Sequence, residues 1–560
     1  MQTKNFQTTT ANIPTYWIWI VIGITFLAFS SAIGNDFVNW DDETYLINNT
    51  YIRDLSWNGI KKLFTEPIGE YSVYRPLTYV SYMIEYALWE LNPKGYHFVS
   101  VLLHLINTYL VYQLILRLTS QALLALFVAL FFGIHPMRVE SVAWILARVD
   151  PLYGCFFLLG CLQYLKYIEK NNWVNLVFTF MFFLGAIFSK PAAVVFPVVL
   201  CAIDFYYRRG FTVKVMVEKI PFFLASIAFG LYTMKVQKEA ISDLSTAFTL
   251  LDRFFISSYA VAYYIISLFL PFNLNLTNPL PAKVNNLLPM TYYIAPVFLA
   301  ACMGAVFYFK QHRHFLLFAF ALFLINVGLV IQIIPYGQAV VADRYSYLAH
   351  IALFLAVGYV LQTLLTTKKE WKPSIQIGVV VFALFCTFQT FTQNKVWANS
   401  ATFWTYRLTN DREDYFAYFG RGNYHYSQNN IEAALTDFQK AASFNRPNGA
   451  LYNNLGFCYY LKGDYSNALQ WFVRATQHTP QDAEAHNNKG NALYMLKDFN
   501  AAIQAYNTTL QLNPNHLAAM EFRGLSYLNL QQKEQACKDL QTAAQLGNAE
   551  AGQYWQQYCK

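Results

Sequence analysis

Apolar runs long enough to cross a lipid bilayer recur along the first 391 residues of this 560-residue chain. A membrane-spanning α-helix needs about 20 mostly apolar residues, and all its backbone polar groups are satisfied within the helix. We expect the stretch 220–234, which is shorter and contains Pro221, to be interfacial or re-entrant. We expect eleven spans, at 14–33, 97–116, 119–134, 151–168, 173–189, 191–207, 253–270, 291–309, 315–334, 346–366 and 373–391.

The charge content agrees with a membrane protein. Only 13% of the residues are charged, against about 25% in average soluble chains, so an ordinary soluble fold is excluded. Residues 1–410 carry 28 Lys and Arg against 19 Asp and Glu. These basic residues lie in loops between the apolar runs, where they indicate topology rather than nucleic-acid binding.

Positive charges in short loops mark the cytoplasmic side of a membrane protein. Five basic clusters are consistent with an N-terminus inside and eleven passes. The segment 34–96, the turn 135–150 and everything after residue 392 then share the non-cytoplasmic side. The first run, 14–33, has an apolar core too long for a signal peptide, and we expect it to be a retained helix.

A 34-residue period begins at Tyr415. Glycines recur with this spacing at 422, 456, 490 and 524, and alanines follow them at 434, 468, 502 and 536. This period is typical of the tetratricopeptide repeat, whose paired helices stack into a superhelix with a concave groove. We expect peptide binding in this groove, although its polar residues could also be merely solvated. The groove candidates are Asn453, Asn454, Asn487 and Asn488.

The predicted fold is all-α, with a multi-pass helical membrane domain followed by an α-solenoid of four tetratricopeptide repeats. The eight cysteines contain no CxxC pair, so we interpret them as small apolar fillers that do not settle the redox compartment. The expected parts are a first transmembrane helix (1–33), a first loop (34–96), a multi-pass domain (97–391), a linker (392–414), the repeats (415–550) and a tail (551–560).

Acidic residues follow the first span directly, at Asp41, Asp42 and Glu43. Adjacent carboxylates that are enclosed repel one another, which raises the pKa of at least one and suits a general base. A solvated helix cap is the alternative interpretation.

Cations from several later turns would gather on the same face of the membrane. Arginine offers a fork that matches phosphate oxygens, and lysine a point charge. For any single cation an internal salt bridge or snorkelling is the alternative. The candidates for donor phosphate binding are Arg75, Arg138, Arg148, Lys190 and Arg344. The candidates for supporting roles are His135, Glu140, Asp150 and Asp343.

These motifs, together with the repeats, resemble the transmembrane and tetratricopeptide repeat O-mannosyltransferase family and its bacterial relatives, which are C-type (GT-C) glycosyltransferases. The matching pieces include Val38-Asn39-Trp40-Asp41-Asp42-Glu43, Tyr74-Arg75-Pro76-Leu77 and Asp343-Arg344-Tyr345-Ser346-Tyr347-Leu348. The resemblance implies a polyprenyl- or dolichyl-phosphate sugar donor, a protein hydroxyl as acceptor, and a base at Asp41 or Asp42. The chain has fewer repeats and shorter loops than the eukaryotic pattern, which leaves sugar and acceptor open.

We therefore expect an inverting transfer of mannose or another hexose from a polyprenyl phosphate to a Ser or Thr hydroxyl. The expected place is a bacterial inner membrane, with the repeats holding acceptor protein on the periplasmic side. No cofactor is required, although clustered carboxylates would also suit a divalent metal. Two alternatives are a polysaccharide or lipid glycosyltransferase that uses a lipid-linked sugar, and a non-catalytic scaffold.

Overall fold

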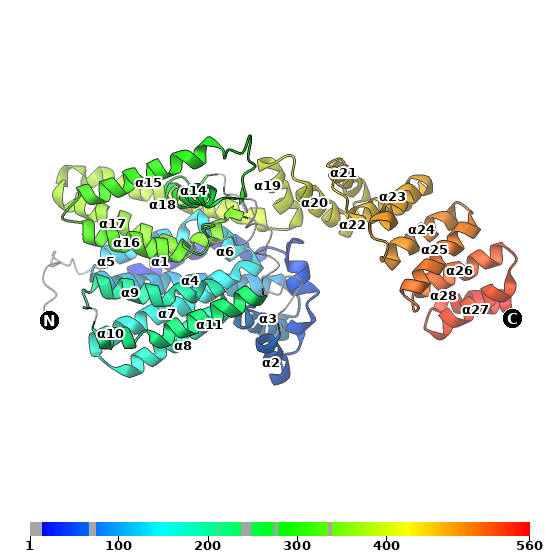
Figure 1. Ribbon diagram of the computed structural model, residues 1–560, viewed down its shortest axis with the longest axis horizontal. Coiled ribbons are helices and arrows are strands. Elements are labelled where there is room, and N and C mark those ends of the chain that lie inside the picture. Colours follow the sequence, from blue (N-terminus) through cyan, green and yellow to red (C-terminus); the bar gives the residue numbers. More distant parts are fainter. Residues whose placement is uncertain are drawn as a thin grey trace. The chain divides into compact units, whose positions relative to one another are not determined.

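A computed structural model describes residues 14–66, 74–210, 212–236, 248–272, 274, 278–333 and 339–560. Helices dominate it, and the prediction of an all-α fold is confirmed (Figure 1). The strands found in this part of the chain are β1 (Asn278–Pro279) and β2 (Ala339–Val341), which pair antiparallel. The chain divides into two compact units, residues 1–403 and 404–560.

Unit 1 holds the apolar helices. They are α1 (Trp17–Phe29), α2 (Trp57–Thr65), α3 (Pro76–Trp89), α4 (Pro93–Thr119), α5 (Ala122–Ile134), α6 (Val139–Ala143), α7 (Val149–Lys170), α8 (Trp173–Ser189), α9 (Phe196–Tyr206), α10 (Val213–Val217), α11 (Ile220–Val236), α14 (Leu250–Ser267), α15 (Met290–Tyr308), α16 (Arg313–Val327), α17 (Ala349–Thr367) and α18 (Lys372–Asn394). Short 3-10 or π segments lie between them: η1 (Ser30–Gly34), η2 (Glu43–Ile47), η3 (Thr50–Arg53), η4 (Pro136–Arg138), η5 (Ile145–Arg148), η6 (Pro191–Val195), η7 (Asp343–Ser346), η8 (Lys369–Trp371) and η9 (Lys395–Trp397).

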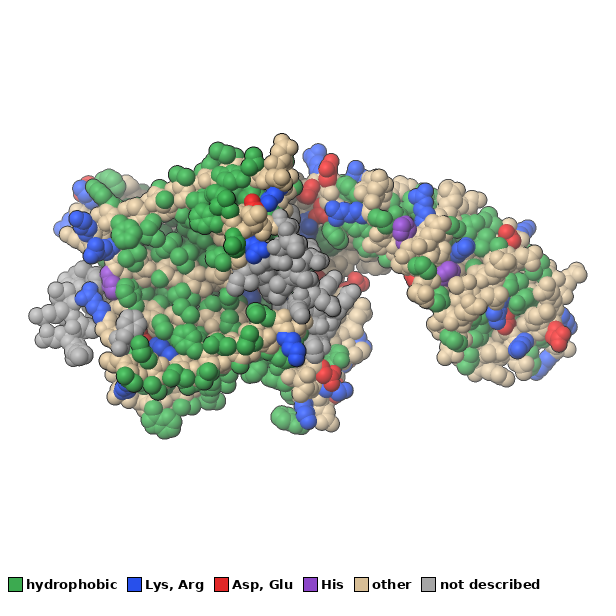
Figure 2. Space-filling model, in the orientation of Figure 1, with side chains coloured by type: hydrophobic (Ala, Val, Ile, Leu, Met, Phe, Trp, Pro, Cys, Tyr) green, Lys and Arg blue, Asp and Glu red, His purple; other side chains and the backbone are tan. Residues whose placement is uncertain are grey.

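Unit 1 is a multi-pass membrane domain. In the described part of the chain, seven helices are long and apolar enough to span a bilayer, and the bent pair Ala122–Ile134 and Pro136–Ala143 can form an eighth span. Three shorter apolar helices, Trp173–Ser189, Pro191–Tyr206 and Arg313–Val327, accompany them. Apolar side chains cover most of the visible surface of this unit (Figure 2), as lipid contact requires.

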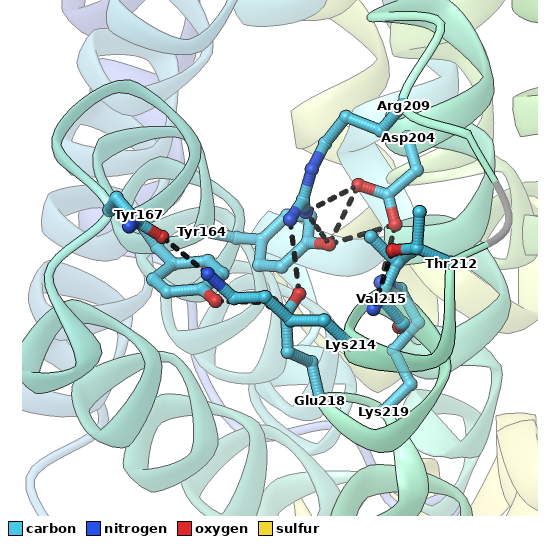
Figure 3. Close-up of polar contacts among 10 residues, drawn as sticks. Tyr164, Tyr167, Asp204, Arg209, Thr212, Lys214, Val215, Glu218 and Lys219 are labelled. Carbon is cyan, nitrogen blue, oxygen red and sulfur yellow. Dashed lines mark hydrogen bonds and ion pairs between the residues drawn. The ribbon is translucent and has the colours of Figure 1, made fainter.

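The helix α11 runs between the two faces of the bundle, contrary to the expectation that 220–234 is interfacial. At its start, Lys219 pairs with Asp204 at the end of α9, and Arg209 pairs with Glu218 at 3.2 Å (Figure 3). Near its other end, the ring of Tyr232 lies 4.9 Å from that of Tyr74. Tyr74 belongs to the end of the bundle where residues 34–66 and 74–75 lie, which we call the first-loop face.

The helix α14 covers most of the expected span 253–270, but it is not among the candidate spans found in the described residues. The Tyr259 ring stacks at 4.3 Å on Tyr292 at the start of α15, and one turn later the Tyr263 hydroxyl donates to Asp343 at 3.0 Å. A membrane pass at 253–270 therefore stays a prediction.

Unit 2 consists of stacked helix pairs that follow α19 (Ser400–Asn410), whose first residues belong to unit 1. Its helices are α20 (Tyr415–Ser427), α21 (Ile431–Ala442), α22 (Gly449–Leu461), α23 (Tyr465–His478), α24 (Ala483–Met495), α25 (Phe499–Leu512), α26 (Leu517–Asn529), α27 (Lys533–Gln545) and α28 (Ala549–Cys559). The predicted linker 392–414 is therefore largely helical. A disulfide joins Cys537 in α27 to Cys559 in α28, so the interpretation of the cysteines as fillers is wrong for this pair.

The periodic glycines are the points where paired helices touch. A Cβ atom at Gly490 would lie 2.5 Å from the Tyr506 ring, whereas one at Gly552 would lie at an ordinary 3.5 Å from Ala544. Glycine is therefore required at the first position by the packing of α24 on α25, and is not required at the second.

We predict opposite effects of Gly490→Ala and Gly552→Ala on stability. Both gain about 1 kcal/mol of helix propensity, but only the first overpacks a contact, at about 1–3 kcal/mol. The thermal unfolding of unit 2 should therefore shift downward for Gly490→Ala relative to Gly552→Ala. Equal melting temperatures for the two variants would contradict this packing.

Candidate active site

The carboxylate of Asp42 is fixed by two hydrogen bonds. Its Oδ2 accepts from the backbone N–H of Val38 at 2.9 Å, and its Oδ1 accepts from Nε1–H of Trp144 at 3.0 Å. The residue is only 1% exposed. Burial raises the pKa of Asp42 to about 7, and the two hydrogen bonds oppose this rise. Asp42 therefore fixes the conformation of the first loop, and its carboxylate is too buried to contact a substrate.

Asp41 differs from its neighbour because it is only partly buried. Burial raises the pKa of Asp41, and the positive charges of Arg344 and Arg75 oppose this rise. Both guanidinium groups thus lie within electrostatic reach of the carboxylate. Of the two acids, Asp41 is the one that can meet a substrate.

Arg344 is anchored by Glu140. The two side chains form an ion pair, and the backbone N–H of Arg344 donates to Glu140 Oε2 at 2.8 Å. The guanidinium also lies 5.6 Å above the ring of Trp144. The Arg344 side chain keeps 20% of its surface exposed, whereas Glu140 keeps 2%. The buried acid therefore orients a cation that remains accessible.

Lys190 is held in the same way by Asp150. The two form an ion pair in which the lysine side chain is 14% exposed and the aspartate is buried. Burial lowers the pKa of Lys190, and the charges of Arg344 and Arg75 add to this decrease, whereas Asp150 opposes it. The three cations therefore lie close enough to repel one another, and the nearby carboxylates of Asp150, Glu140 and Asp41 offset this repulsion.

Arg75 precedes α3, and the Thr78 hydroxyl donates to the carbonyl of Ser189 at 3.0 Å. This bond brings the start of α3 to the end of α8, beside Lys190. The Nε atom of Arg75 is buried, and no hydrogen-bond partner for it is found in the described part of the chain. We call Asp41, Arg75, Lys190 and Arg344 the Asp41 cluster.

Arg148 lies apart from this cluster. It is completely buried, forms an ion pair with Glu85, and donates from Nε to the hydroxyl of Ser100 at 3.0 Å. Its guanidinium also donates to the carbonyl of Tyr96. Arg148 therefore joins α3, α4 and α7 and has no exposed surface for a ligand.

Arg138 and His135 also lie in the interior. The Nη2 atom of Arg138 donates to the Ser346 hydroxyl and to Nδ1 of His350, both at 2.8 Å. His135 Nε2 lies 3.1 Å from the carbonyl oxygen of Leu268. Both side chains are completely buried, so neither has exposed surface for a ligand.

Sequence reasoning missed the residues that hold the cations in place. Ser346 and His350 carry no signal of their own, because their partner Arg138 lies about 210 positions away in the sequence. Glu85 does carry a signal. An acid inside an apolar stretch such as Ile84-Glu85-Tyr86-Ala87-Leu88 requires a buried partner.

The groove asparagines form pairs between successive repeats. Asn454 Nδ2 donates to Asn423 Oδ1 at 2.9 Å, and Asn488 Nδ2 donates to Asn453 Oδ1 at 3.1 Å. Asn487 is 5% exposed, and its Oδ1 has no partner within the described residues. Asn423 is a groove residue that the sequence analysis did not select.

Across the described residues, no group of three or more His, Cys, Asp or Glu side chains is arranged to hold a metal ion. Two of the candidate carboxylates are paired with cations, Glu140 with Arg344 and Asp150 with Lys190.

Comparisons with known proteins support both parts of the chain. Residues 483–516 match the family model described as tetratricopeptide repeat, and residues 458–497 match the model described as TPR repeat. The human protein O-mannosyl-transferase TMTC3 is 22% identical over 500 residues, which cover 80% of this chain and 53% of that protein. The Xenopus laevis protein O-mannosyl-transferase tmtc2 is 32% identical over 153 residues, 26% of this chain and 18% of that protein.

These relatives confirm the resemblance to the transmembrane and tetratricopeptide repeat O-mannosyltransferases, although the chain spans only about half the length of TMTC3. Among solved structures, the TPR protein YrrB, described as having an unusual peptide-binding site, is 23% identical with a TM-score of 0.27, over 28% of this chain and 82% of that one. MamA is 18% identical with a TM-score of 0.26, over 27% of this chain and 90% of that one.

The different positions of Arg148 and Arg75 predict different effects on stability. Arg148→Met leaves Glu85 buried without its cation, which typically costs about 3–5 kcal/mol. Arg75→Met removes a partly exposed cation whose described contacts include no ion pair, so we expect little change in the unfolding temperature. Thermal unfolding in detergent measures both variants, and equal unfolding temperatures would contradict the structural role of Arg148.

Proposed function

We propose that this chain, which is similar over 80% of its length to a protein O-mannosyl-transferase, is a membrane glycosyltransferase. It transfers a hexose, mannose by analogy with the relatives' names, from a polyprenyl phosphate to a Ser or Thr hydroxyl of a protein. The observation that carries this proposal is the Asp41 cluster, in which a partly exposed carboxylate lies within electrostatic reach of Arg75 and Arg344, and these two lie within reach of Lys190. A base beside a phosphate site is what this chemistry needs.

The reaction is a single displacement with inversion. Asp41 accepts the proton of the acceptor hydroxyl, and the hydroxyl oxygen forms a bond to the anomeric carbon of the sugar. The bond from this carbon to the phosphate oxygen breaks, and its electron pair leaves with the lipid phosphate. Because the oxygen attacks from the side opposite the leaving group, the anomeric configuration is inverted.

Arg75, Lys190 and Arg344 stabilise the negative charge that develops on the departing phosphate. The ion pairs with Glu140 and Asp150 fix Arg344 and Lys190 before the donor arrives, so little reorganisation is needed during the reaction. Arg75 has no ion-pair partner among the described residues, and the exposed part of its side chain would contact an oxygen of the donor.

The disulfide between Cys537 and Cys559 supports a non-cytoplasmic location for the repeats. Disulfides persist in oxidising compartments and are rare in the cytosol. In a bacterial host this side is the periplasm and the membrane is the inner one. The reaction then takes place on the first-loop face, to which α18 leads the chain before the repeats begin.

The repeats would bind the acceptor protein. The paired asparagines present amide groups at consecutive repeats, and these groups can hydrogen-bond the backbone of an extended peptide. The buried Oδ1 of Asn487 is an acceptor without a described partner. Tethering the acceptor in this way raises its local concentration at the reaction centre.

Asp41→Asn is the direct test of the base. We expect the rate of sugar transfer to fall by about 10²–10⁴-fold, because an amide cannot accept the proton, while the amount of folded protein is unchanged. Asp54→Asn, at an exposed first-loop position, is the matched control and should transfer at the wild-type rate. The assay is transfer from polyprenyl-phosphate mannose to a Ser/Thr peptide, and full activity of Asp41→Asn would contradict the assignment.

The location of the repeats can be tested by thiol labelling of intact cells. A membrane-impermeant maleimide should label Cys537 and Cys559 only after treatment with a reductant, because both are oxidised and outside the cytoplasm. The Cys537→Ser/Cys559→Ser variant is the control for labelling at the six other cysteines. Labelling of this pair without reductant, or only after the cells are lysed, would contradict the proposed location.

A further inference from the structure

We propose that residues 394–403, which connect the last membrane helix to the repeats, form one wall of the reaction centre, with Trp397 as a positioning residue for the first-loop carboxylates. The proposal rests on the proposed function, because it assigns a role in the same reaction. It differs in its residues, since nothing in the Asp41 cluster comes from this segment. We call residues 394–403 the connecting segment.

A stack of aromatic rings joins the connecting segment to the first loop. Trp397 packs at 5.5 Å and 15° on Trp144, which in turn packs at 4.8 Å and 12° on Trp40. Phe403 closes the stack, with ring centroids 5.3 Å from Trp40 and 4.9 Å from Trp397. Trp397 is 1% exposed and Phe403 is fully buried. Such large buried rings tolerate little displacement.

Hydrogen bonds fix the backbones of the same two segments. The N–H of Asp36 donates to the carbonyl of Ala398 at 2.9 Å, and the N–H of Asn39 donates to the Ser400 hydroxyl at 2.9 Å. Asn35 Nδ2 also donates to the carbonyl of Asn394, at 3.3 Å. The connecting segment thus binds the stretch of chain that leads directly into Asp41 and Asp42.

Trp144 links the position of Trp397 to the charged groups of the proposed reaction centre. Its Nε1–H donates to Asp42 Oδ1, and its ring lies under the guanidinium of Arg344. A movement of Trp144 would therefore displace a carboxylate of the first loop and a cation of the Asp41 cluster together. Trp397 covers the ring of Trp144 and so fixes it, without itself contacting either charged group in any described interaction.

The connecting segment therefore has two tasks. It carries the chain from the membrane helices to the repeats, and it supports the first loop from one side. Misplacing a catalytic group by about 1 Å can cost about 10²-fold in rate. A loss of this support should consequently lower the rate of the chemical step rather than the binding of donor or acceptor.

The test compares Trp397→Ala with Trp397→Phe in the full-length protein. We expect Trp397→Ala to lower kcat for transfer to a peptide by about 10²-fold, with the KM for the peptide changed less than about twofold. Trp397→Phe keeps a ring in the stack and should recover most of the rate. Trp371→Ala removes a tryptophan that is 55% exposed and should behave as wild type.

The pH profile distinguishes positioning from a general loss of structure. The Trp144 hydrogen bond lowers the pKa of Asp42, whereas burial, Asp41 and Asp36 raise it. If Trp144 moves away, Asp42 loses a hydrogen bond that favours its charged form, so its pKa rises. The first loop depends on the ionised Asp42 carboxylate, so the loop and with it the activity are then lost at a higher pH, and the acid limb of the rate profile shifts upward. A Trp397→Ala protein with wild-type kcat, or with a rate reduced only in proportion to its folded fraction and an unshifted profile, would overturn the proposal.

Hydrogen exchange gives a readout that does not depend on activity. Trp397→Ala should speed exchange of the amides in residues 35–42, because Asp36, Val38 and Asn39 donate the bonds described above, while the amides of α2 keep their rates. If the wild-type protein transfers no sugar, the proposed function fails whatever the exchange shows. Unchanged exchange in 35–42 would overturn the role of Trp397 even in an active enzyme.

Discussion

The structure depends on placing charged groups at the end of an apolar helix bundle, where an unpaired charge is costly. Three of the buried acids form ion pairs with specific cations: Glu140 with Arg344, Asp150 with Lys190 and Glu85 with Arg148. In two of these pairs the acid is buried while the cation keeps some exposure. Because the buried acids Glu140 and Asp150 hold Arg344 and Lys190 in fixed positions, the positive charges of these two cations stay accessible.

The first loop is built around the same constraint. Asp42 is buried and bonded to Val38 and Trp144, so the loop has one shape, and Asp41 is the neighbour that stays accessible. Of the two adjacent acids, Asp42 thus has a structural role, and Asp41 is the proposed general base. The connecting segment belongs to this arrangement because Trp397 supports Trp144, which joins the catalytic loop to the part of the chain that leads into the repeats.

The sequence predicted what periodicity and charge can reveal: the apolar helices, the 34-residue repeats, and the acids and cations of one face. It could not separate Arg148 from Arg75, because the difference lies in Glu85, a partner 63 positions away from Arg148. Nor did it identify α11 as a candidate span, because the shortness of the apolar run 220–234 and Pro221 favoured an interfacial helix. The pair Cys537 and Cys559, 22 residues apart without a motif, became visible only when α27 and α28 were packed together.

The central claim is that the Asp41 cluster performs an inverting sugar transfer from a lipid phosphate to a protein hydroxyl. The most direct measurement uses the purified full-length protein in lipid nanodiscs, polyprenyl-phosphate mannose of known anomeric configuration and a Ser/Thr peptide, with NMR of the product linkage. The account predicts a mannosylated peptide whose anomeric configuration is opposite to that of the donor. A product with retained configuration, or sugar found only on lipid or polysaccharide acceptors, would contradict it.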